Sequence, residues 1–166
     1  MKNVSFIGLG SNLDDKIGYI TAAIKELNNH KLCRVVKVSS LYETKPYGNV
    51  KQDNFINGVL ELETELSVKE LFLFTKEIEK KIGRKFREKW GPREIDLDVL
   101  FYNDLVYSDE KLNIPHKDVL NRDFVLVPLA EIEPELYHPV IDKKINEIDI
   151  SQLESNILKK IDYQFM

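Results

Sequence analysis

Length, composition and charge exclude several classes of protein. The 166 residues are 43% hydrophobic, which predicts one globular domain over residues 1–166. The 24 basic and 28 acidic side chains give a net charge of −4, which argues against a binder of duplex DNA. Cys33 is the only cysteine, and no signal peptide or membrane-length apolar run is found, so we expect a soluble cytoplasmic protein.

The first half of the chain predicts strands around a helix. Residues 4–9 read as a buried strand, and Asp14 as the cap of an amphipathic helix over residues 15–29. β-Branched residues predict a strand over residues 32–42, and turn-forming residues predict an exposed loop over residues 43–54. The turn after the first strand is predicted to contain Gly8, Gly10, Ser11 and Asn12.

The second half predicts a strand, a helix and a strand, followed by additions. A strand over residues 55–63 precedes a helix that begins at the capping box of Ser67 and ends at Gly83. A basic loop over residues 84–93 leads into a strand that ends near Phe101. The remaining segments are predicted as a short strand at residues 106–107, helices over residues 122–131 and 143–153, and an element of either type at residues 157–166.

This order of elements, β-α-β-β-α-β, is that of the split βαβ, or ferredoxin-like, arrangement. We therefore predict an α+β fold, in which helices pack on an antiparallel sheet and additions follow at the C-terminal side.

Two aspartates on the last of these strands predict a metal site. Asp96 and Asp98 alternate with apolar residues, so on a strand both carboxylates point to the same face, about 7 Å apart. Such oxygens suit Mg²⁺, which commonly shares one or two carboxylates with the phosphates of a substrate. The alternative interpretation is an ordinary solvated face of an antiparallel strand. A zinc site is not expected, because no Cys/His cluster has suitable spacing.

The basic loop before the aspartates predicts phosphate recognition. Arg84, Arg87 and Arg93 can each form forked contacts with phosphate oxygens, and they can stabilise the charge of a phosphoryl transition state. The alternative is a solvated run of charge. No Walker sequence follows the glycines near residue 8, so we expect nucleotide binding without a glycine-rich phosphate cradle.

Aromatic and polar residues elsewhere suggest a site for a flat heterocycle. Phe55 and Phe124 can sandwich such a ring, and Asn57, on the same strand face as Phe55, offers a donor and an acceptor to the ring edge. His116 and Arg122 can hold phosphate or ribose groups. The alternative is that the two phenylalanines belong to the core and that the histidine is structural.

Several distinctive motifs occur in order along the chain. The longest is residues 89–100, KWGPREIDLDVL. Shorter ones are residues 8–12 (GLGSN), 40–48 (SLYETKPYG), 55–57 (FIN), 114–116 (IPH) and 121–124 (NRDF). Together these motifs resemble the 6-hydroxymethyl-7,8-dihydropterin pyrophosphokinase family of folate biosynthesis.

The resemblance implies that a whole pyrophosphate passes from ATP to the hydroxymethyl oxygen of the pterin, with AMP as the leaving group. It implies two Mg²⁺ ions on Asp96 and Asp98, and assistance from Arg84 and Arg93. The implied pterin-binding residues are Thr44, Tyr47, Phe55, Asn57, Trp90 and Phe124. The implied ATP-binding residues are Glu79, Lys111, His116 and Arg122. We expect these two small molecules as ligands of a monomer that binds no nucleic acid and no membrane.

Some positions depart from the family pattern. Phe55 and Lys111 stand where tyrosine and arginine are common, and the loop after Arg84 is one residue short, which leaves Arg87 without an assigned role. Two other functions are compatible with parts of the chain. A metal-dependent phosphodiesterase or nucleotidyl transferase would need the acidic pair and the arginines but no planar pocket, and an RNA-binding ferredoxin-like module would need exposed aromatic residues on central strands.

Overall fold

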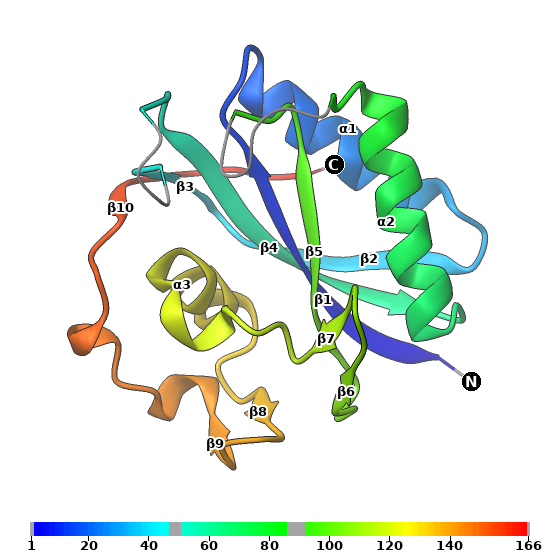
Figure 1. Ribbon diagram of the computed structural model, residues 1–166, viewed down its shortest axis with the longest axis vertical. Coiled ribbons are helices and arrows are strands. Elements are labelled where there is room, and N and C mark those ends of the chain that lie inside the picture. The colour runs from blue at the N-terminus through cyan, green and yellow to red at the C-terminus, as the bar shows by residue number, and fades with distance from the viewer. Residues whose placement is uncertain (1, 47–50, 86–91, 166) are drawn as a thin grey trace.

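An antiparallel sheet forms the centre of the molecule (Figure 1). Its strands are β1 (Asn3–Ser11), β2 (Cys33–Val38), β3 (Leu41–Thr44), β4 (Phe55–Thr64), β5 (Asp96–Tyr102) and β10 (Ile157–Ile161). In the computed structural model, which describes residues 2–46, 51–85 and 92–165, the strand order is β10–β3–β4–β1–β5, and β2 also pairs with β4. The predicted α+β class is confirmed, because the order β3–β4–β1–β5 is the ferredoxin-like one.

Helices cover both faces of this sheet, and the coverage is unequal. Helices α1 (Lys16–Asn29) and α2 (Val68–Ile82) pack on one face, and α3 (Asp123–Ile132) packs on the other (Figure 1). Along β1, Ile7 and Leu9 enter the core beneath α1 and α2, whereas Phe6 enters the core beneath α3. The single helix α3 leaves one end of its face uncovered, and the functional residues gather there.

Local sequence determines both ends of α2 as expected. Ser67 and Glu70 exchange side-chain to backbone hydrogen bonds of 3.2 and 2.8 Å, which is the predicted capping box and contributes roughly 1 kcal/mol. Gly83 ends the helix at φ 114°, a left-handed conformation that favours glycine. This turn directs the chain toward the edge of the sheet that carries β5.

The cap of α1 was predicted at the wrong residue. Asp15, not Asp14, accepts a hydrogen bond from the backbone N–H of Gly18. Asp14 lies in the left-handed region at φ 56°, so its side chain is not in the position of a cap.

Several predicted boundaries in the first half are also corrected. Gly8, Gly10 and Ser11 do not form a turn, because they continue β1 and pair with β4. The predicted strand over residues 32–42 is interrupted at Ser39 and Ser40, where the Ser39 hydroxyl bonds to the backbone instead. The second piece, β3, extends to Thr44 into the predicted loop.

The segment after α3 contains no long helix over residues 143–153. Ile145 is buried, and Ile148 and Leu153 are partly buried against the same core, but this segment makes these contacts through two short 3₁₀ turns. Residues 157–161, which were open between helix and strand, form β10. The short elements are β6 (Tyr107–Ser108), β7 (Asn113–Ile114), β8 (Tyr137–His138), β9 (Lys143–Lys144) and the 3₁₀ turns Val119–Asn121, Ile145–Glu147 and Ile150–Gln152.

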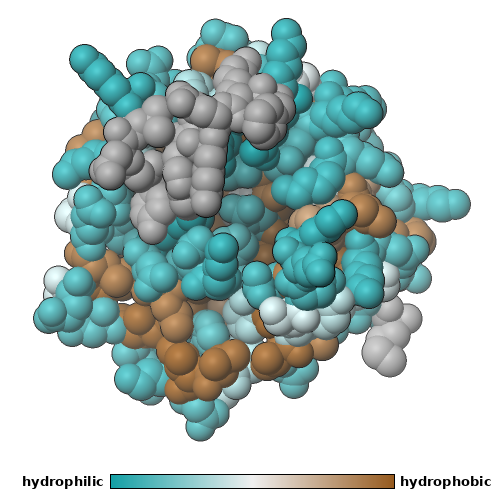
Figure 2. Space-filling view, viewed as in Figure 1, coloured by the Kyte–Doolittle hydropathy of each residue, from teal (hydrophilic) through white to brown (hydrophobic). Residues whose placement is uncertain are grey.

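The surface in this view is mostly hydrophilic, with hydrophobic residues gathered toward its lower edge (Figure 2). Val106 and Val140 are strongly exposed hydrophobic residues of the chain. In the part of the chain that the structure describes, every helix is too short or too polar to cross a membrane.

Candidate active site

The two aspartates lie on one face of β5, at the end of the sheet that α3 leaves open. Asp96 and Asp98 line a pocket on that face, while Leu97 between them is buried beneath α1 and α2. The predicted strand geometry is therefore confirmed. Across the adjacent strand, Gly10 is the register partner of Asp96 and Gly8 is the partner of Asp98. The carboxylates consequently stand beside a strip of β1 that carries no side chains.

Gly10 has a specific steric reason to be glycine. A Cβ atom at this position would lie 2.7 Å from Oδ1 of Asn57 on the opposite strand β4. Gly8, Gly10 and Gly58 all line the pocket, although the sequence was interpreted as placing the first two in a turn. The glycines keep the floor of the pocket open to a bound molecule.

Arginines hold Asp96 from two sides. Nη1 of Arg84 lies 3.1 Å from Oδ1 of Asp96, and Nη1 of Arg93 lies 3.2 Å from Oδ2. Burial raises the pKa of Asp96, but the charges of Arg93 and Arg84 outweigh burial and hold this pKa below its ordinary value. Asp96 is therefore ionised. Arg93 lines the pocket with it, whereas Arg84 contacts Asp96 from outside the lining.

Asp98 has a different environment. Burial, followed by the nearby charge of Asp96, raises the pKa of Asp98 above its ordinary value. Nε2 of His116 lies 3.8 Å from Oδ1 of Asp98, while Nδ1 of the same ring accepts a hydrogen bond from the backbone of Asp118. Because Nδ1 is the acceptor, Nε2 is the nitrogen that carries a proton toward the carboxylate.

Glu79 supports this charged group from beneath. It is 5% exposed; Oε2 accepts a 2.7 Å hydrogen bond from the backbone N–H of Leu97, and Oε1 lies 2.9 Å from Nη1 of Arg84. Glu79 thus fixes β5 between the two aspartates and also fixes an arginine that contacts Asp96. It does not line the pocket with them.

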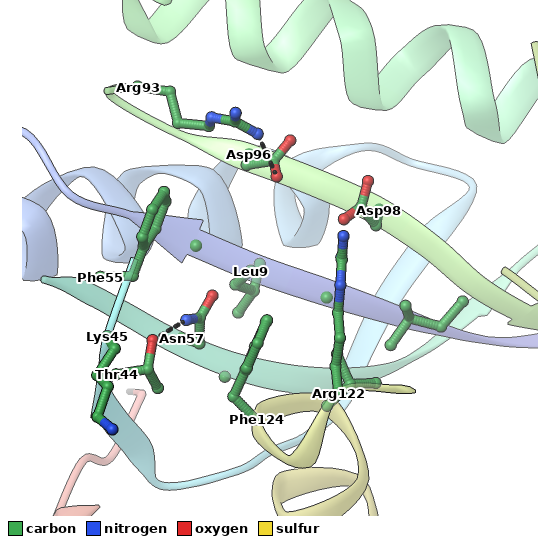
Figure 3. A pocket seen from close by; sticks show the side chains of 15 residues that line it. Leu9, Thr44, Lys45, Phe55, Asn57, Arg93, Asp96, Asp98, Arg122 and Phe124 are labelled. Carbon is green, nitrogen blue, oxygen red and sulfur yellow. Dashed lines mark hydrogen bonds and ion pairs between the residues drawn. The ribbon is translucent and has the colours of Figure 1, made fainter. Parts of the chain in front are cut away.

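Two aromatic rings and the polar side chains of Thr44 and Asn57 form the other end of the pocket, with Lys45 beside Thr44 (Figure 3). The rings of Phe55 and Phe124 stand on either side of Asn57, whose amide donates a 2.8 Å hydrogen bond to Oγ1 of Thr44. The guanidinium of Arg93 lies 5.9 Å from the ring centre of Phe55, and that of Arg122 lies 5.7 Å from the ring centre of Phe124. Each aromatic wall therefore has an arginine above it on the side of the aspartates. The pocket joins a slot for a flat ring to a strongly charged end.

Comparison with known proteins identifies this arrangement. The family described as 7,8-dihydro-6-hydroxymethylpterin-pyrophosphokinase matches residues 6–134. The chain belongs to this family. The family prediction made from the motifs is confirmed, and with it the assignment of the chain as a pyrophosphokinase.

Individual relatives in the family agree. The chain is 46% identical over 142 residues to the 2-amino-4-hydroxy-6-hydroxymethyldihydropteridine pyrophosphokinase of Aquifex aeolicus, a match that covers 86% of this chain and 88% of the relative. It is 40% identical to the bifunctional protein FolKE of Lactococcus lactis, over 94% of this chain but 45% of that protein. Its fold is similar, with a TM-score of 0.70, to wild-type Plasmodium falciparum HPPK-DHPS with pteroate, at 17% identity over 88% of this chain and 41% of that one.

The pocket is lined by most of the described residues that the motifs predicted, but Glu79, Arg84 and His116 lie outside its lining. Lys111 lies exposed in the turn between β6 and β7 and does not line the pocket. Tyr47 and Trp90, together with Arg87, lie outside the described residues. Lys45 lines the pocket and was not predicted; its position next to Thr44 at the end of a strand was the available signal.

The two carboxylates fit a magnesium site and not a self-contained metal cage. Among the residues that the structure describes, no group of three or more His, Cys, Asp or Glu side chains surrounds a common point. Asp96 and Asp98 instead present oxygens from one strand to an open pocket. Mg²⁺ suits such a pair, because it retains waters and takes its other ligands from substrate phosphates.

Proposed function

We propose that this pocket transfers the β,γ-pyrophosphoryl group of ATP to the hydroxymethyl oxygen of 6-hydroxymethyl-7,8-dihydropterin, in folate biosynthesis. The oxygen attacks the β-phosphorus, the bond from that phosphorus to the α,β-bridging oxygen breaks, and AMP leaves. One observation carries the proposal: Phe55, Asn57 and Phe124 share a single pocket with Asp96 and Asp98. A ring and a polyphosphate can thus be bound next to one another.

The neutral end suits a pterin. Phe55 and Phe124 can stack on its two faces, each such contact contributing about 0.5–1.5 kcal/mol beyond the area buried. Asn57 carries both a donor and an acceptor, and its hydrogen bond to Thr44 fixes the orientation of the amide. The ring is thereby oriented, and its hydroxymethyl group can be directed toward the charged end.

The charged end suits the phosphates. Asp96 and Asp98 would hold two Mg²⁺ ions, which supply positive charge to the attacking and leaving oxygens when they are bound. Arg84 and Arg93, which both form ion pairs with Asp96, would stabilise charge that shifts during transfer. Both are delocalised cations with forked donors, which suits them to phosphate oxygens.

His116 and Arg122 are proposed to hold the nucleotide, and Glu79 and Lys111 are proposed to face it. Nε2 of His116 lies 3.8 Å from Oδ1 of Asp98, and Figure 3 shows Arg122, the residue before α3, extending toward that aspartate. We further propose that Tyr47 and Trp90 complete the pterin site, and that the chain acts as a one-domain monomer in the cytoplasm.

Mass spectrometry of the products tests this function directly. Incubation with ATP, Mg²⁺ and the reduced pterin is expected to yield AMP and the pterin diphosphate in equal amounts. Formation of ADP would contradict a one-step pyrophosphoryl transfer. A nucleic-acid phosphodiesterase, in contrast, would have no use for the slot between Phe55 and Phe124, and failure to bind pterin would favour it.

A further inference from the structure

A segment beyond the family match reaches the wall of the ring slot. The match ends at residue 134, and the chain then passes α3 and rises to pair with β3 as strand β10 (Figure 1). In this pairing Ile157 is the register partner of Thr44. The residue before β10, Asn156, is 3% exposed, so it is an interior residue of the fold.

Asp123, the first residue of α3, binds this segment. Its Oδ2 accepts hydrogen bonds from the backbone N–H groups of Asn156 and Ile157, at 2.9 and 3.2 Å, and its Oδ1 accepts one of 3.3 Å from the amide of Asn156. Asp123 is 7% exposed, so this carboxylate exchanges water for protein donors. Charge-assisted bonds of this kind are stronger than neutral ones, especially where water is excluded.

The same asparagine binds the opposite wall of the slot. The backbone carbonyl of Asn156 accepts a 2.9 Å hydrogen bond from the backbone N–H of Lys45. Lys45 and Thr44 line one side of the pocket, while Phe124, the residue after Asp123, lines the other. Asp123 and Asn156 therefore connect the two walls, although neither lines the pocket itself.

We propose that Asp123 and Asn156 are positioning residues that set the width of the pterin slot. The inference rests on the proposed function, because it assumes that the ring binds between these walls. Phe55 is the register partner of Thr44 on the wall that Asn156 holds, and Thr44 also orients the amide of Asn57. Stacking depends on close contact with both faces of a ring, so the spacing of Phe55 and Phe124 depends on this connection. Loosening the connection should weaken pterin binding without changing the charged end.

Glu131, near the other end of α3, supplies a matched control. Its carboxylate also accepts three hydrogen bonds, from the backbone and hydroxyl of Ser40 at 2.9 Å each and from the hydroxyl of Tyr42 at 2.6 Å. It likewise ties α3 to the strands, but it is exposed and none of these residues lines the pocket. Carboxylate-to-amide changes at Asp123 and Glu131 therefore both remove hydrogen-bond acceptors that tie α3 to its neighbours, but only the change at Asp123 lies on the connection between the two walls of the slot.

Calorimetry with the reduced pterin, in the presence of Mg²⁺ and a non-hydrolysable ATP analogue, tests the inference. Asp123→Asn replaces one accepting carboxylate oxygen with an NH₂ group, which cannot accept hydrogen bonds from the N–H groups of Asn156 and Ile157. The substitution should raise the Kd for pterin by about tenfold, while the Kd for the analogue stays within about twofold. Asn156→Ala keeps the backbone donors and should raise the Kd for pterin by about threefold. Glu131→Gln should lower the melting temperature and leave the Kd for pterin unchanged.

The outcomes separate this inference from the proposed function. If wild-type protein binds no pterin, or if Phe124→Ala binds it as well as wild type does, the proposed function and this inference fail together. Should wild type bind through Phe124 while both Asp123→Asn and Asn156→Ala keep wild-type affinity, the inference alone is overturned. Equal loss of affinity for pterin and nucleotide would also overturn it, because that is the result of general destabilisation.

Discussion

Different interactions hold the side chains at the two ends of the pocket. At the charged end, Asp96 is held by ion pairs to Arg84 and Arg93, while burial and then the nearby charge of Asp96 raise the pKa of Asp98. At the ring end, Phe55, Asn57 and Phe124 are neutral, and hydrogen bonds and packing hold them. Without its ligands, the charged end therefore holds two neighbouring carboxylates that disfavour each other's ionisation. At the ring end, in contrast, Asn57 already has a hydrogen-bond partner in Thr44. Changes at the charged end should alter kcat, and changes at the ring end should alter the KM for pterin.

The largest effect is expected at the charged end. Asp98→Ala should lower kcat by about 10³-fold or more, since several kcal/mol of charge stabilisation depend on this carboxylate. Steady-state assays in Mg²⁺ measure the loss, and circular dichroism should show an intact fold. The affinity for pterin alone should stay near that of wild type. A near-normal rate in this variant would remove Asp98 from the chemistry.

A smaller effect is expected at the ring end from Asn57→Ala. The substitution removes polar recognition of the ring edge and leaves Thr44 without its 2.8 Å donor. We expect the KM for pterin to rise by about 10- to 100-fold, which corresponds to about 1–3 kcal/mol. The KM for ATP serves as the internal control and should change little. A variant that loses kcat at an unchanged KM for pterin would contradict the division between the two ends.

Loss of stacking should be weaker still. Phe124→Leu keeps an apolar side chain but removes the ring, so the KM for pterin should rise by about 3- to 10-fold. Val125 lines the same wall, and Val125→Ala is a comparison that removes bulk without removing an aromatic ring. Equal effects of the two substitutions would show that the wall contributes bulk and not stacking.

The smallest effect concerns stability in the absence of ligands. Burial and the charge of Asp96 raise the pKa of Asp98, so the folded chain holds this proton more tightly than the unfolded chain does. That stabilisation is present below the pKa of the unfolded carboxyl and is lost as pH rises through the raised pKa. Asp98→Asn should therefore be more stable than wild type in EDTA, by on the order of 1 kcal/mol or about 2–4 °C, at neutral pH.

Thermal melts across pH give this prediction its control. The gain from Asp98→Asn should shrink as the pH falls through the raised pKa of the wild-type carboxyl, because that carboxyl then becomes protonated too. Asp96→Asn should behave in the opposite way and lower the melting temperature at neutral pH, because Arg84 and Arg93 lose a charged partner. A gain from Asp98→Asn that is independent of pH would rule out the electrostatic explanation.

Local sequence was sufficient where a short pattern determines the structure. The alternation around Leu97 placed both aspartates on one face of a strand, because strand geometry repeats every two residues. The capping box of Ser67 and the stop at Gly83 were predicted for the same reason, since each depends on residues within one helical turn.

Local sequence failed where distant partners decide the structure. Gly8 and Gly10 suggest a turn by composition, yet β4 and β5 pair with them on both sides and hold them extended. The spacing of apolar residues after residue 143 suggests a helix, but only Ile145 is fully buried there and the segment forms two short 3₁₀ turns.

By itself, the amino-acid sequence determined that this chain is a pyrophosphokinase of ferredoxin-like fold with an acidic pair on a strand. Those features depend on the order of motifs and on the alternation of apolar and polar residues, which are properties of the sequence whether or not the chain is folded. Only the tertiary structure decided that a neutral slot adjoins the acidic pair, and that Asn156 lies between Asp123 and Lys45. Contacts between residues far apart in sequence exist only when the core brings their strands and helices together, because the geometry of short segments does not specify them.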